Sequence, residues 1–386
     1  MLRDYLTSLP EKEKKVVFFD EMPWMDTARS GFLNAFEYFW NSFGASLDNL
    51  VFIVCGSASS WLAEHIDRNK GGLFNRLTCR LYLEPFSLHE TELYLRSMGI
   101  EWSRYDIAEC YMVMGGIPYY LSLLRNDLSC PANIDHIFFR KRAELWDEFS
   151  HLYHTLFSNG DKYIRIVEAL SERHNGLTME ALARKTGLPV NGDLSRILHD
   201  LTDTGFIRVN TFFGKKKRDA CYQLADYYTL FYFRFLKDNP GTDEHFWSAG
   251  TGTPARNAWA GFTFELLCMD HIRQIKKALD IAGVISEHSV WYTRGDDSRD
   301  GTQIDLLIDR RDRVINLCEI KFSTGAFEID KAYDMRLRNM VNIFREATGT
   351  KKTLTVTMIT TYGVKKNMYS SHVGREVCLE DLFEKV

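Results

Sequence analysis

The sequence predicts a multidomain protein of mixed α/β class. Its pattern is a strand–helix–strand near the N-terminus, short amphipathic helices with a strand pair in the middle, and a helix with charged strands near the C-terminus. The chain has 386 residues, of which 45% are hydrophobic and 13% aromatic. That length is enough for two or three domains of about 100–200 residues each. The composition excludes an intrinsically disordered chain, which would be poor in aromatic and aliphatic residues.

The cysteines, the apolar runs and the net charge exclude further classes of protein. The 8 cysteines are scattered without a CxxC pair, which excludes a disulfide-stapled miniprotein and is typical of a reduced, intracellular protein. No apolar run approaches the roughly 18–20 residues of a membrane span, and the N-terminus lacks the apolar region of a signal peptide. We therefore expect a cytoplasmic protein. A net charge of −4 argues against a surface that coats nucleic acid, but a local basic patch stays open.

The N-terminal pattern begins with an apolar run that ends in two acids. Residues 16–21 read Val-Val-Phe-Phe-Asp-Glu, which predicts a buried parallel strand with Asp20 and Glu21 at its carboxyl end. A helix predicted over 31–43 and a second apolar run over 50–55 complete a βαβ unit. Open α/β sheets bind ligands at such strand ends. The two acids can equally end a strand or cap the next helix.

Several motifs in residues 15–240 resemble the prokaryotic AAA-like P-loop ATPases of the STAND class. They are FFDEMPWMD (18–26), FWNSF (39–43), CGSASSW (55–61), GGLFNR (71–76), LEPFSLHE (83–90) and GGIPYY (115–120). That family joins a P-loop core to a helical lid and a winged helix. The resemblance implies a partial P-loop core over 1–84, a helical lid over 85–160 and a winged helix over 161–238.

The resemblance also implies a site for ATP and Mg²⁺. In such ATPases the first acid of the Walker B strand, here Asp20, holds Mg²⁺, and the second, here Glu21, polarises the water that attacks the γ-phosphate. Ser57 stands where the family keeps a polar sensor for the γ-phosphate, and Arg76 stands where an arginine is thought to reach a phosphate. Ser57 can equally be ordinary turn chemistry at the end of a strand.

The phosphate-binding loop of that family does not occur in the sequence. A P-loop needs the string GxxxxGK[ST], because glycine amides cradle the phosphates and the lysine neutralises them. The 386 residues contain no such string, and few residues precede the Walker-B-like strand. We therefore expect a truncated P-loop core with a sheet edge and apolar faces left uncovered. ATP hydrolysis by this chain alone is not expected.

The middle of the chain predicts a winged helix-turn-helix. Amphipathic helices over 163–170, 176–187 and 191–204 precede a strand, a turn and a strand. The turn carries the basic residues Lys215, Lys216, Lys217 and Arg218. Such side chains can neutralise DNA phosphates, although a charge run at a hairpin tip is more often a solvated turn. DNA binding and a structural role against the lid are both open.

The C-terminal third predicts a separate domain. Residues 239–254 are rich in Pro, Gly and Thr, as is typical of a linker, and residues 255–386 form the predicted domain after it. A strong helix is expected over 258–279. Residues 303–309 and 314–321 then read as an antiparallel hairpin joined by a charged turn.

The hairpin carries a candidate catalytic group. Glu319 and Lys321 are two positions apart, so both face the same side of their strand, and the hairpin can place Asp305 beside them. Two carboxylates and an ammonium suit Mg²⁺-dependent cleavage of a phosphodiester, in which the acids hold the metal and the lysine orients or activates water. Half-buried strands also carry such charges by chance.

This D…ExK pattern resembles the PD-(D/E)xK nuclease superfamily. The resemblance implies a restriction-endonuclease-like α/β domain in which Asp305 and Glu319 hold Mg²⁺ and Lys321 is catalytic. Glu265, in the preceding predicted helix, matches the acid that the family often supplies from its first helix, and the resemblance implies that it also holds the metal. The sequence departs from the pattern at Gln303, where a residue other than an acid precedes Ile-Asp.

These expectations combine into three functions. The first, which we favour, is an ATP-binding switch coupled to a nuclease-like effector, in defence or in control of mobile elements. The second is a Mg²⁺-dependent DNA nuclease that keeps the ATPase remnant as a scaffold. The third is a non-catalytic DNA-binding regulator. The expected partners are ATP and DNA, with no membrane, and self-association into a homo-oligomer is expected from the ATPase resemblance.

Overall fold

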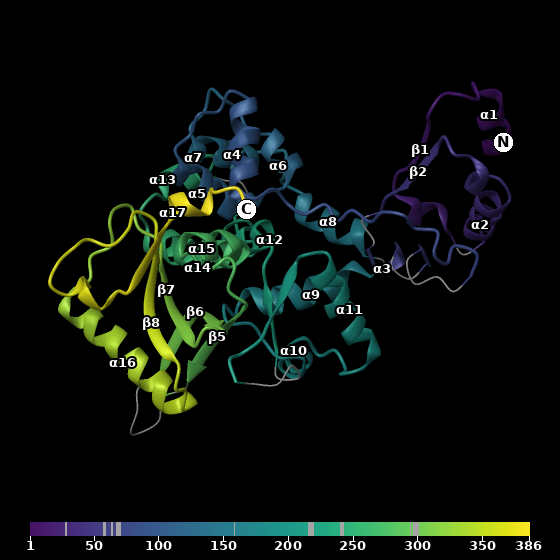
Figure 1. The fold of residues 1–386 in the computed structure, drawn as a ribbon. Coiled ribbons are helices and arrows are strands. Elements are labelled where there is room, and N and C mark those ends of the chain that lie inside the picture. Colours follow the sequence, from purple (N-terminus) through teal and green to yellow (C-terminus); the bar gives the residue numbers. More distant parts are fainter. Residues whose placement is uncertain are drawn as a thin grey trace. The chain divides into compact units, whose positions relative to one another are not determined.

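The structure is a computed structural model of the chain (Figure 1). It describes residues 1–27, 29–56, 59–62, 65–66, 71–157, 159–214, 220–239, 243–293, 295 and 301–386. The chain divides into two compact units. The first comprises Met1–Leu83, Leu152–Tyr163 and Asn191–Gly205, and the second comprises Glu84–His151, Ile164–Val190 and Phe206–Val386. Among the described residues, no helix combines the length and the apolar character that a bilayer crossing demands.

The first unit contains the strand–helix–strand pattern that the sequence predicts. Its elements are α1 (Leu2–Ser8), β1 (Lys15–Phe19), η1 (Met22–Met25), α2 (Phe32–Ser42), η2 (Gly44–Ser46), β2 (Leu50–Val54) and α3 (Ser59–Leu62). The strands β1 and β2 pair in parallel, with Lys15 opposite Leu50. Rings of α2 and of the strands pack together on one face, where the Phe36 and Phe52 centroids are 5.2 Å apart. The expected parallel βαβ unit is therefore present.

The burial of β1 differs from the expectation of a strand buried on both faces. Val16 and Phe18 are 64% and 55% exposed, and Val51 and Ile53 of β2 are 48% and 44% exposed. Successive side chains of a strand point to opposite faces, and α2 packs on one face only. The predicted uncovered apolar face is thus a feature of this unit.

The second unit begins with a helical segment, which lies within residues 85–160; that these residues form a lid stays a prediction. Its elements are α4 (Leu88–Ser97), α5 (Arg104–Met114), α6 (Pro118–Ser122), α7 (Cys130–Ile134) and the π-helical turn η4 (Asp135–Phe139). Helix α5 ends at Gly115, which has φ 66°. The neighbouring Gly116 accepts a hydrogen bond from the Phe86 amide at 2.7 Å. The Gly-Gly-x-Pro string is therefore a helix break.

The helices of the predicted helix-turn-helix form where the sequence places them. After α8 (Glu148–Leu156) the elements are α9 (Gly160–Ser171), α10 (Met179–Thr186), α11 (Gly192–Asp203), β3 (Ile207–Asn210) and β4 (Cys221–Leu224). The Thr178 side chain caps α10 by accepting from the Ala181 amide, and Gly187 ends the helix with φ 69°. The strands β3 and β4 pair antiparallel. Local capping chemistry explains why these boundaries could be predicted.

Residues 239–254, expected as a linker, contain a packed helix. The segment follows α12 (Tyr227–Phe231) and the π-helical turn η6 (Tyr232–Leu236) and includes α13 (Phe246–Ala249). Trp247 of α13 is only 1% exposed, and its ring lies 5.4 Å from that of Trp259. Its amide donates to Asp135 at 2.7 Å. The described part of this segment therefore packs within the second unit and is not an unpacked linker between domains.

The helix expected over 258–279 is two helices, α14 (Pro254–Asp270) and α15 (Ile272–Ala278). The break lies at His271, whose Nε2 accepts a hydrogen bond from the Leu88 amide at 3.0 Å. Its Nδ1 lies 2.9 Å from the Leu267 carbonyl. Because Leu88 opens α4, far away in the sequence, apolar spacing alone could not reveal this break.

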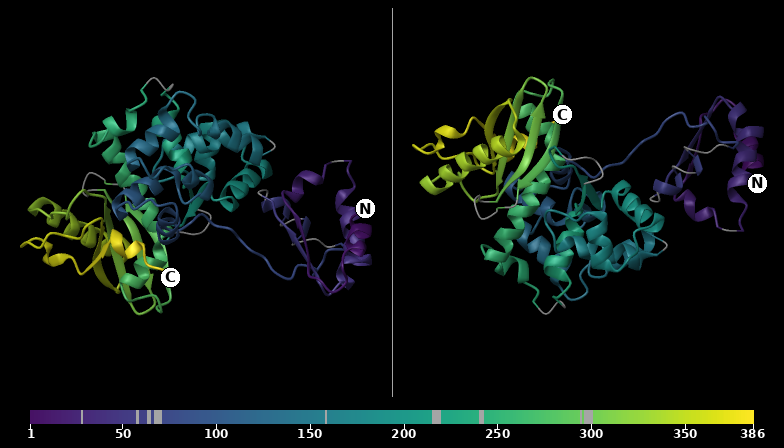
Figure 2. Two further views of the ribbon diagram at one scale, coloured as in Figure 1. Left: turned by 90° about the horizontal axis from the view of Figure 1, so that it is seen from above. Right: turned by 90° about the horizontal axis from the view of Figure 1, so that it is seen from below.

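A mixed five-stranded sheet follows, in the order β5-β6-β7-β8-β9. The strands are β5 (Ser286–Thr293), β6 (Thr302–Arg310), β7 (Val314–Lys321), β8 (Thr353–Thr360) and β9 (Arg375–Cys378), with the helices α16 (Lys331–Thr348), η7 (Ser370–His372) and α17 (Leu379–Leu382). The first three strands are antiparallel, as the hairpin prediction requires, and the last three are parallel. Helix α16 lies along the sheet (Figures 1 and 2) and buries Leu337, Met340 and Phe344 against it.

Candidate functional site

Two carboxylates meet on neighbouring strands of this sheet. Leu306 of β6 pairs with Cys318 of β7, so Asp305 lies opposite Glu319 one step further along the ladder. Both side chains are buried. Asp305 Oδ2 accepts a hydrogen bond from the Ile320 amide at 3.1 Å, which ties its carboxylate to the partner strand. The hairpin therefore brings the two acids together as the sequence predicts.

Lys321 lies on the same side of β7 as Glu319. Its Nζ is 2.9 Å from Glu319 Oε1, and it donates a hydrogen bond to the Ile320 carbonyl at 3.0 Å. The lysine side chain is 28% exposed, whereas that of Glu319 is 1% exposed. The ammonium thus lies between the buried acid and solvent, where a charged substrate can reach it.

Helix α16 adds two residues that sequence reasoning missed. The Tyr333 hydroxyl donates to Glu319 Oε1 at 2.7 Å, and an Arg336 guanidinium nitrogen lies 3.1 Å from the same oxygen. Glu319 Oε1 therefore accepts two hydrogen bonds and is paired with the Lys321 ammonium, whereas Oε2 has no such partner among the described residues. A parallel connection places the first turn of its crossover helix near the carboxyl end of the strand before it. That topology was the only signal for Tyr333 and Arg336 in the sequence.

Glu265 of α14 completes a group of interacting acids. Burial, with the Asp305 carboxylate next in importance, raises the pKa of Glu265 to about 8. Burial and the Glu319 carboxylate raise the pKa of Asp305 to about 6. Each acid therefore disfavours the charge of its neighbour, and the group ionises fully only at alkaline pH or beside additional positive charge.

The oxygen atoms of this group are ligands that suit Mg²⁺, but the Lys321 ammonium lies where the ion would contact them. Carboxylate and carbonyl oxygens are the ligands that Mg²⁺ prefers. Among the residues that the structure describes, no three His, Cys, Asp or Glu side chains are grouped closely enough to hold a metal ion. Lys321 contacts both Glu319 Oε1 and the Ile320 carbonyl. A divalent ion at these two oxygens requires that the lysine side chain move aside.

The residues predicted for an ATP site lie in the first unit. Asp20 is exposed after β1 and accepts a hydrogen bond from Cys55 Sγ at 2.8 Å, and Glu21 adopts a left-handed conformation with φ 48°. Arg76 is exposed directly after the turn 72–75 and forms no ion pair with Asp20 in the part of the chain that is described. Ser57 lies outside the described residues. Binding of ATP by this group stays a prediction.

The residues predicted to contact DNA are described only in part. The basic run Lys215–Arg218 lies outside the described residues. On the exposed side of α11, Arg196 pairs with Asp193 at 2.7 Å, and His199 lies 3.1 Å from Asp203. The described face of this helix therefore carries little unbalanced positive charge.

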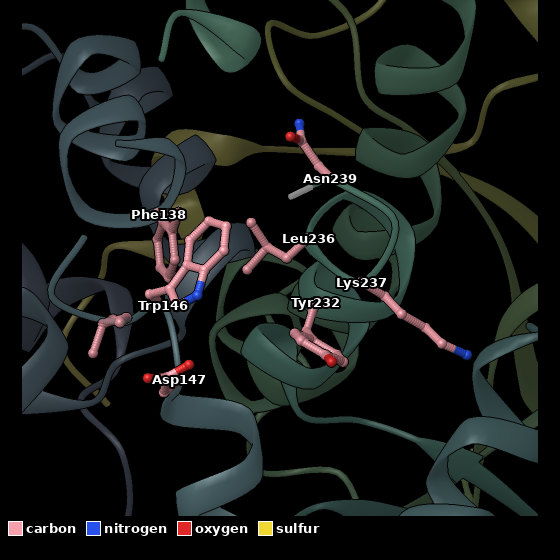
Figure 3. A pocket seen from close by; sticks show the side chains of 8 residues that line it. Phe138, Trp146, Asp147, Tyr232, Leu236, Lys237 and Asn239 are labelled. Carbon is pink, nitrogen blue, oxygen red and sulfur yellow. The ribbon is translucent and has the colours of Figure 1, made fainter. Parts of the chain in front are cut away.

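A pocket of about 220 Å³ lies elsewhere in the second unit. It shares no residue with the carboxylate group. It is lined by Phe138, Leu145, Trp146, Asp147, Tyr232, Leu236, Lys237 and Asn239. Figure 3 shows Trp146 and Leu236 facing each other beside Phe138, while the Lys237 ammonium points away from them. The pocket takes walls from both π-helical turns.

Comparisons with known proteins identify one segment by sequence. Residues 161–211 match the IclR helix-turn-helix domain, so the chain contains a helix-turn-helix region. No curated protein matches the chain. A Walker-type ATPase of Pyrococcus abyssi is similar over 57% of this chain and 63% of its own, with 18% identity and a TM-score of 0.40. Protein VC1899 from Vibrio cholerae is similar over 96% of this chain and 89% of its own, with 10% identity and a TM-score of 0.25.

Both structural similarities are too distant to assign an activity, and the chain spans less than two thirds of the ATPase. What is established is a mixed α/β protein with a helix-turn-helix region. The nuclease-like character of the sheet is therefore argued below from the residues alone, and the ATP site of the first unit stays a prediction.

Proposed function

We propose that the second unit hydrolyses phosphodiester bonds with the help of Mg²⁺. One observation carries the proposal: Asp305, Glu319 and Lys321 are held together at a sheet end, with Glu319 contacting the lysine ammonium at 2.9 Å. Buried carboxylates beside a partly exposed lysine supply both a cation site and a positive group for water or phosphate. The proposal extends to the nearby Glu265, whose pKa depends on Asp305.

In this reaction each residue has a defined task. Asp305 and Glu319 would hold Mg²⁺, and Glu265 would add negative charge to the site. The bound ion would lower the pKa of a water molecule and neutralise charge on the phosphoryl group. Lys321 would orient the attacking water, whose oxygen displaces the leaving oxygen at phosphorus. Tyr333 fixes the Glu319 carboxylate through its hydroxyl.

The test is cleavage of single-stranded and duplex DNA by the full chain in Mg²⁺. We expect cleavage to stop in EDTA and to fall by at least about 100-fold in Lys321→Ala and Glu319→Gln, because removal of a catalytic group typically costs about 10²–10⁴-fold. Lys352→Ala is the matched control. That lysine pairs with Asp309 in the same sheet and should leave the cleavage rate unchanged.

Two results would contradict the proposal. Wild-type chain that cleaves neither substrate, although it is folded by circular dichroism, would remove the activity. Cleavage that persists in Lys321→Ala would point to a contaminating nuclease or to another site.

We infer as a second function that the helix-turn-helix region contacts DNA. The match of residues 161–211 to a helix-turn-helix domain supports this inference. Contacts to the phosphate backbone of DNA make such binding salt-dependent, because each neutralised phosphate releases counterions. We expect Lys215→Ala, Lys216→Ala and Lys217→Ala together to weaken duplex binding and to flatten its salt dependence. Arg96→Ala, an exposed arginine of α4, should change neither quantity.

A further inference from the structure

Three aromatic rings form a stack beside the carboxylate group. Phe322 directly follows Lys321 in the sequence. Its ring lies 5.0 Å from that of Tyr105, with 21° between the ring planes. The Tyr105 ring in turn lies 6.0 Å from that of Tyr362, with 11° between the planes. The three nearly parallel rings lead outward from the candidate catalytic lysine.

The topology of the sheet produces this stack. Strands β7 and β8 are parallel, and Lys321 pairs with Thr360, so the residues after both strands emerge at the same edge. The Ser323 amide donates to Thr361 Oγ1 at 2.9 Å, which links the two loops. Tyr105 enters from the first turn of α5. Ligands of such sheets bind outside the carboxyl ends of the strands.

The stack is anchored on its inner side. The Phe322 ring contacts Phe264 of α14, with 5.2 Å between the centroids, and Phe264 precedes Glu265 in the sequence. Phe264 is fully buried. The inner ring is therefore fixed by the same helix that brings the third acid to the site.

The outer ring faces solvent. Tyr362 is 49% exposed, whereas Thr361 before it is 1% exposed and Gly363 after it adopts φ 81°. The backbone around the tyrosine is thus held while much of its ring is uncovered. Burial and the nearby Glu109 carboxylate raise the pKa of Tyr105 to about 12, so that the middle ring stays a neutral phenol.

Two of the acids around the stack are ion-paired, and a third, Asp106, accepts a hydrogen bond from the Ser103 hydroxyl. Glu109 lies 3.2 Å from Arg256, and Glu380 lies 2.5 Å from Arg104. These pairings reduce the repulsion that a phosphate would meet there. On the side of the catalytic group, the Arg336 side chain is 61% exposed and offers a guanidinium to the same ligand.

We propose that Tyr362 and the rings behind it stack an unpaired nucleobase of the nucleic acid that the carboxylate site cleaves. The proposal rests on the proposed phosphodiester hydrolysis and gives it a substrate class, single-stranded nucleic acid. A base in a duplex is stacked and paired within the helix, so its face is not accessible to a protein ring. A base in a single strand can stack on an aromatic side chain in any sequence. The adjoining phosphate then lies toward Lys321 and Arg336.

The experiment measures binding in EDTA, where cleavage is not expected. The full chain is titrated into a fluorescent single-stranded DNA 12-mer, its duplex, and an abasic single strand of the same length. We expect Tyr362→Ala to weaken binding of the 12-mer about 5- to 100-fold, because stacking contributes about 1–3 kcal/mol per base. Binding of the abasic strand should not change, and Tyr362→Phe should bind as the wild type does.

A matched control and a second readout keep the test sharp. Tyr119→Ala removes a tyrosine that is 57% exposed and lies outside the stack, and it should leave all affinities unchanged. A 2-aminopurine in the 12-mer should lose fluorescence on binding to wild type and retain it with Tyr362→Ala, since stacking quenches that base.

The outcomes separate this proposal from the proposed function. Equal weakening of the normal and abasic strands in Tyr362→Ala, or no binding of the 12-mer by wild type, overturns base stacking. Lysine-dependent cleavage with unchanged binding by Tyr362→Ala overturns stacking alone. Tyrosine-dependent binding without cleavage overturns the hydrolase and leaves stacking intact.

Discussion

Glu319 carries an unequal distribution of hydrogen bonds on its two oxygens. Oε1 accepts from Tyr333 and Arg336 and is ion-paired with Lys321, whereas Oε2 accepts from no described residue. A carboxylate fixed through one oxygen keeps the other available at a defined orientation. Lys321 and Arg336 balance the negative charge of Glu319. Burial disfavours the negative charge of Asp305 and Glu265.

The pH dependence of stability follows from those two acids. Their pKa values rise from about 3.8 and 4.5 to about 6 for Asp305 and about 8 for Glu265 in the fold. Between about pH 4 and 8 the folded state therefore binds more protons than the unfolded state, and the free energy of unfolding falls as pH rises. We expect a slope of up to about 1.4 kcal/mol per pH unit for each acid.

Urea unfolding at pH 5, 6.5 and 8 measures that slope, and Glu265→Gln should reduce it most strongly above pH 6. Addition of Mg²⁺ at pH 8 should restore stability to the wild type and have little effect on the variant. A wild-type profile that is flat or rises from pH 5 to 8 would contradict the burial of ionisable charge at this site.

The hydroxyl of Tyr333 is expected to act on Glu319 without contacting substrate. Tyr333→Phe removes the donor to Oε1, and a hydrogen bond to a charged group contributes about 1.5–3 kcal/mol. A double-mutant cycle with Glu319→Gln, read from urea unfolding, should give a coupling free energy of about 1 kcal/mol or more. Additive effects of the two substitutions would show that the contact stabilises nothing.

At the scale of elements, the break after α5 depends on Gly116 as well as on Gly115. A Cβ added at Gly116 would lie 1.9 Å from the Phe86 carbonyl oxygen, which is backbone and cannot rotate away. Gly116→Ala should therefore lower the free energy of unfolding by about 1–3 kcal/mol or more. The matched control is Gly261→Ala within α14, where an added Cβ meets nothing within 4 Å.

The control should instead raise stability by about 0.5–1 kcal/mol, because alanine favours a helix interior over glycine. Thermal unfolding of the two variants, side by side, gives both signs. Equal behaviour of the two variants would mean that the approach of Phe86 to Gly116 is not as close as the structure has it.

The elements that the sequence predicts well are those whose ends are encoded locally. Thr178 and Gly187 cap α10 with their own side chain and backbone, and the turn between β6 and β7 is contained in the sequence around it. The division at His271 escapes prediction because its partner, Leu88, is 183 positions away. Trp247 escapes it for the same reason, since Asp135 lies 112 positions earlier.

The candidate site, too, was predictable only where its residues are encoded by local sequence patterns. Alternation within β7 gives the Glu319–Lys321 pair, and a hairpin gives Asp305. Tyr333 and Arg336 depend on where a crossover helix begins, which no short motif encodes. The residues proposed for ATP and the basic run at 215–218 remain predictions.

At the scale of the whole molecule, the chain first passes from one unit to the other in a stretch without helix or strand. Residues 77–87 have no regular secondary structure, and Leu81, Tyr82 and Leu83 are 82%, 74% and 96% exposed. Exposed apolar residues in an extended segment are preferred sites for chymotrypsin. We expect limited digestion to cut first at these three positions, giving two fragments that mass spectrometry assigns.

The variant Leu81→Ser, Tyr82→Ser, Leu83→Ser should resist that first cut and keep the thermal unfolding of the wild type, because none of the three side chains is buried. First cleavage within the sheet of the second unit, or a destabilised variant, would contradict the exposed course of this segment.

The same stretch contains Cys79, which is exposed, whereas Cys55 and Cys378 are half-buried and the remaining cysteines are buried. A thiol reagent used briefly should therefore modify Cys79 ahead of every other sulfur. A dye or nitroxide attached there needs no engineered residue. It gives the natural chain a spectroscopic label within residues 77–87, from which the local mobility of this segment can be followed in solution.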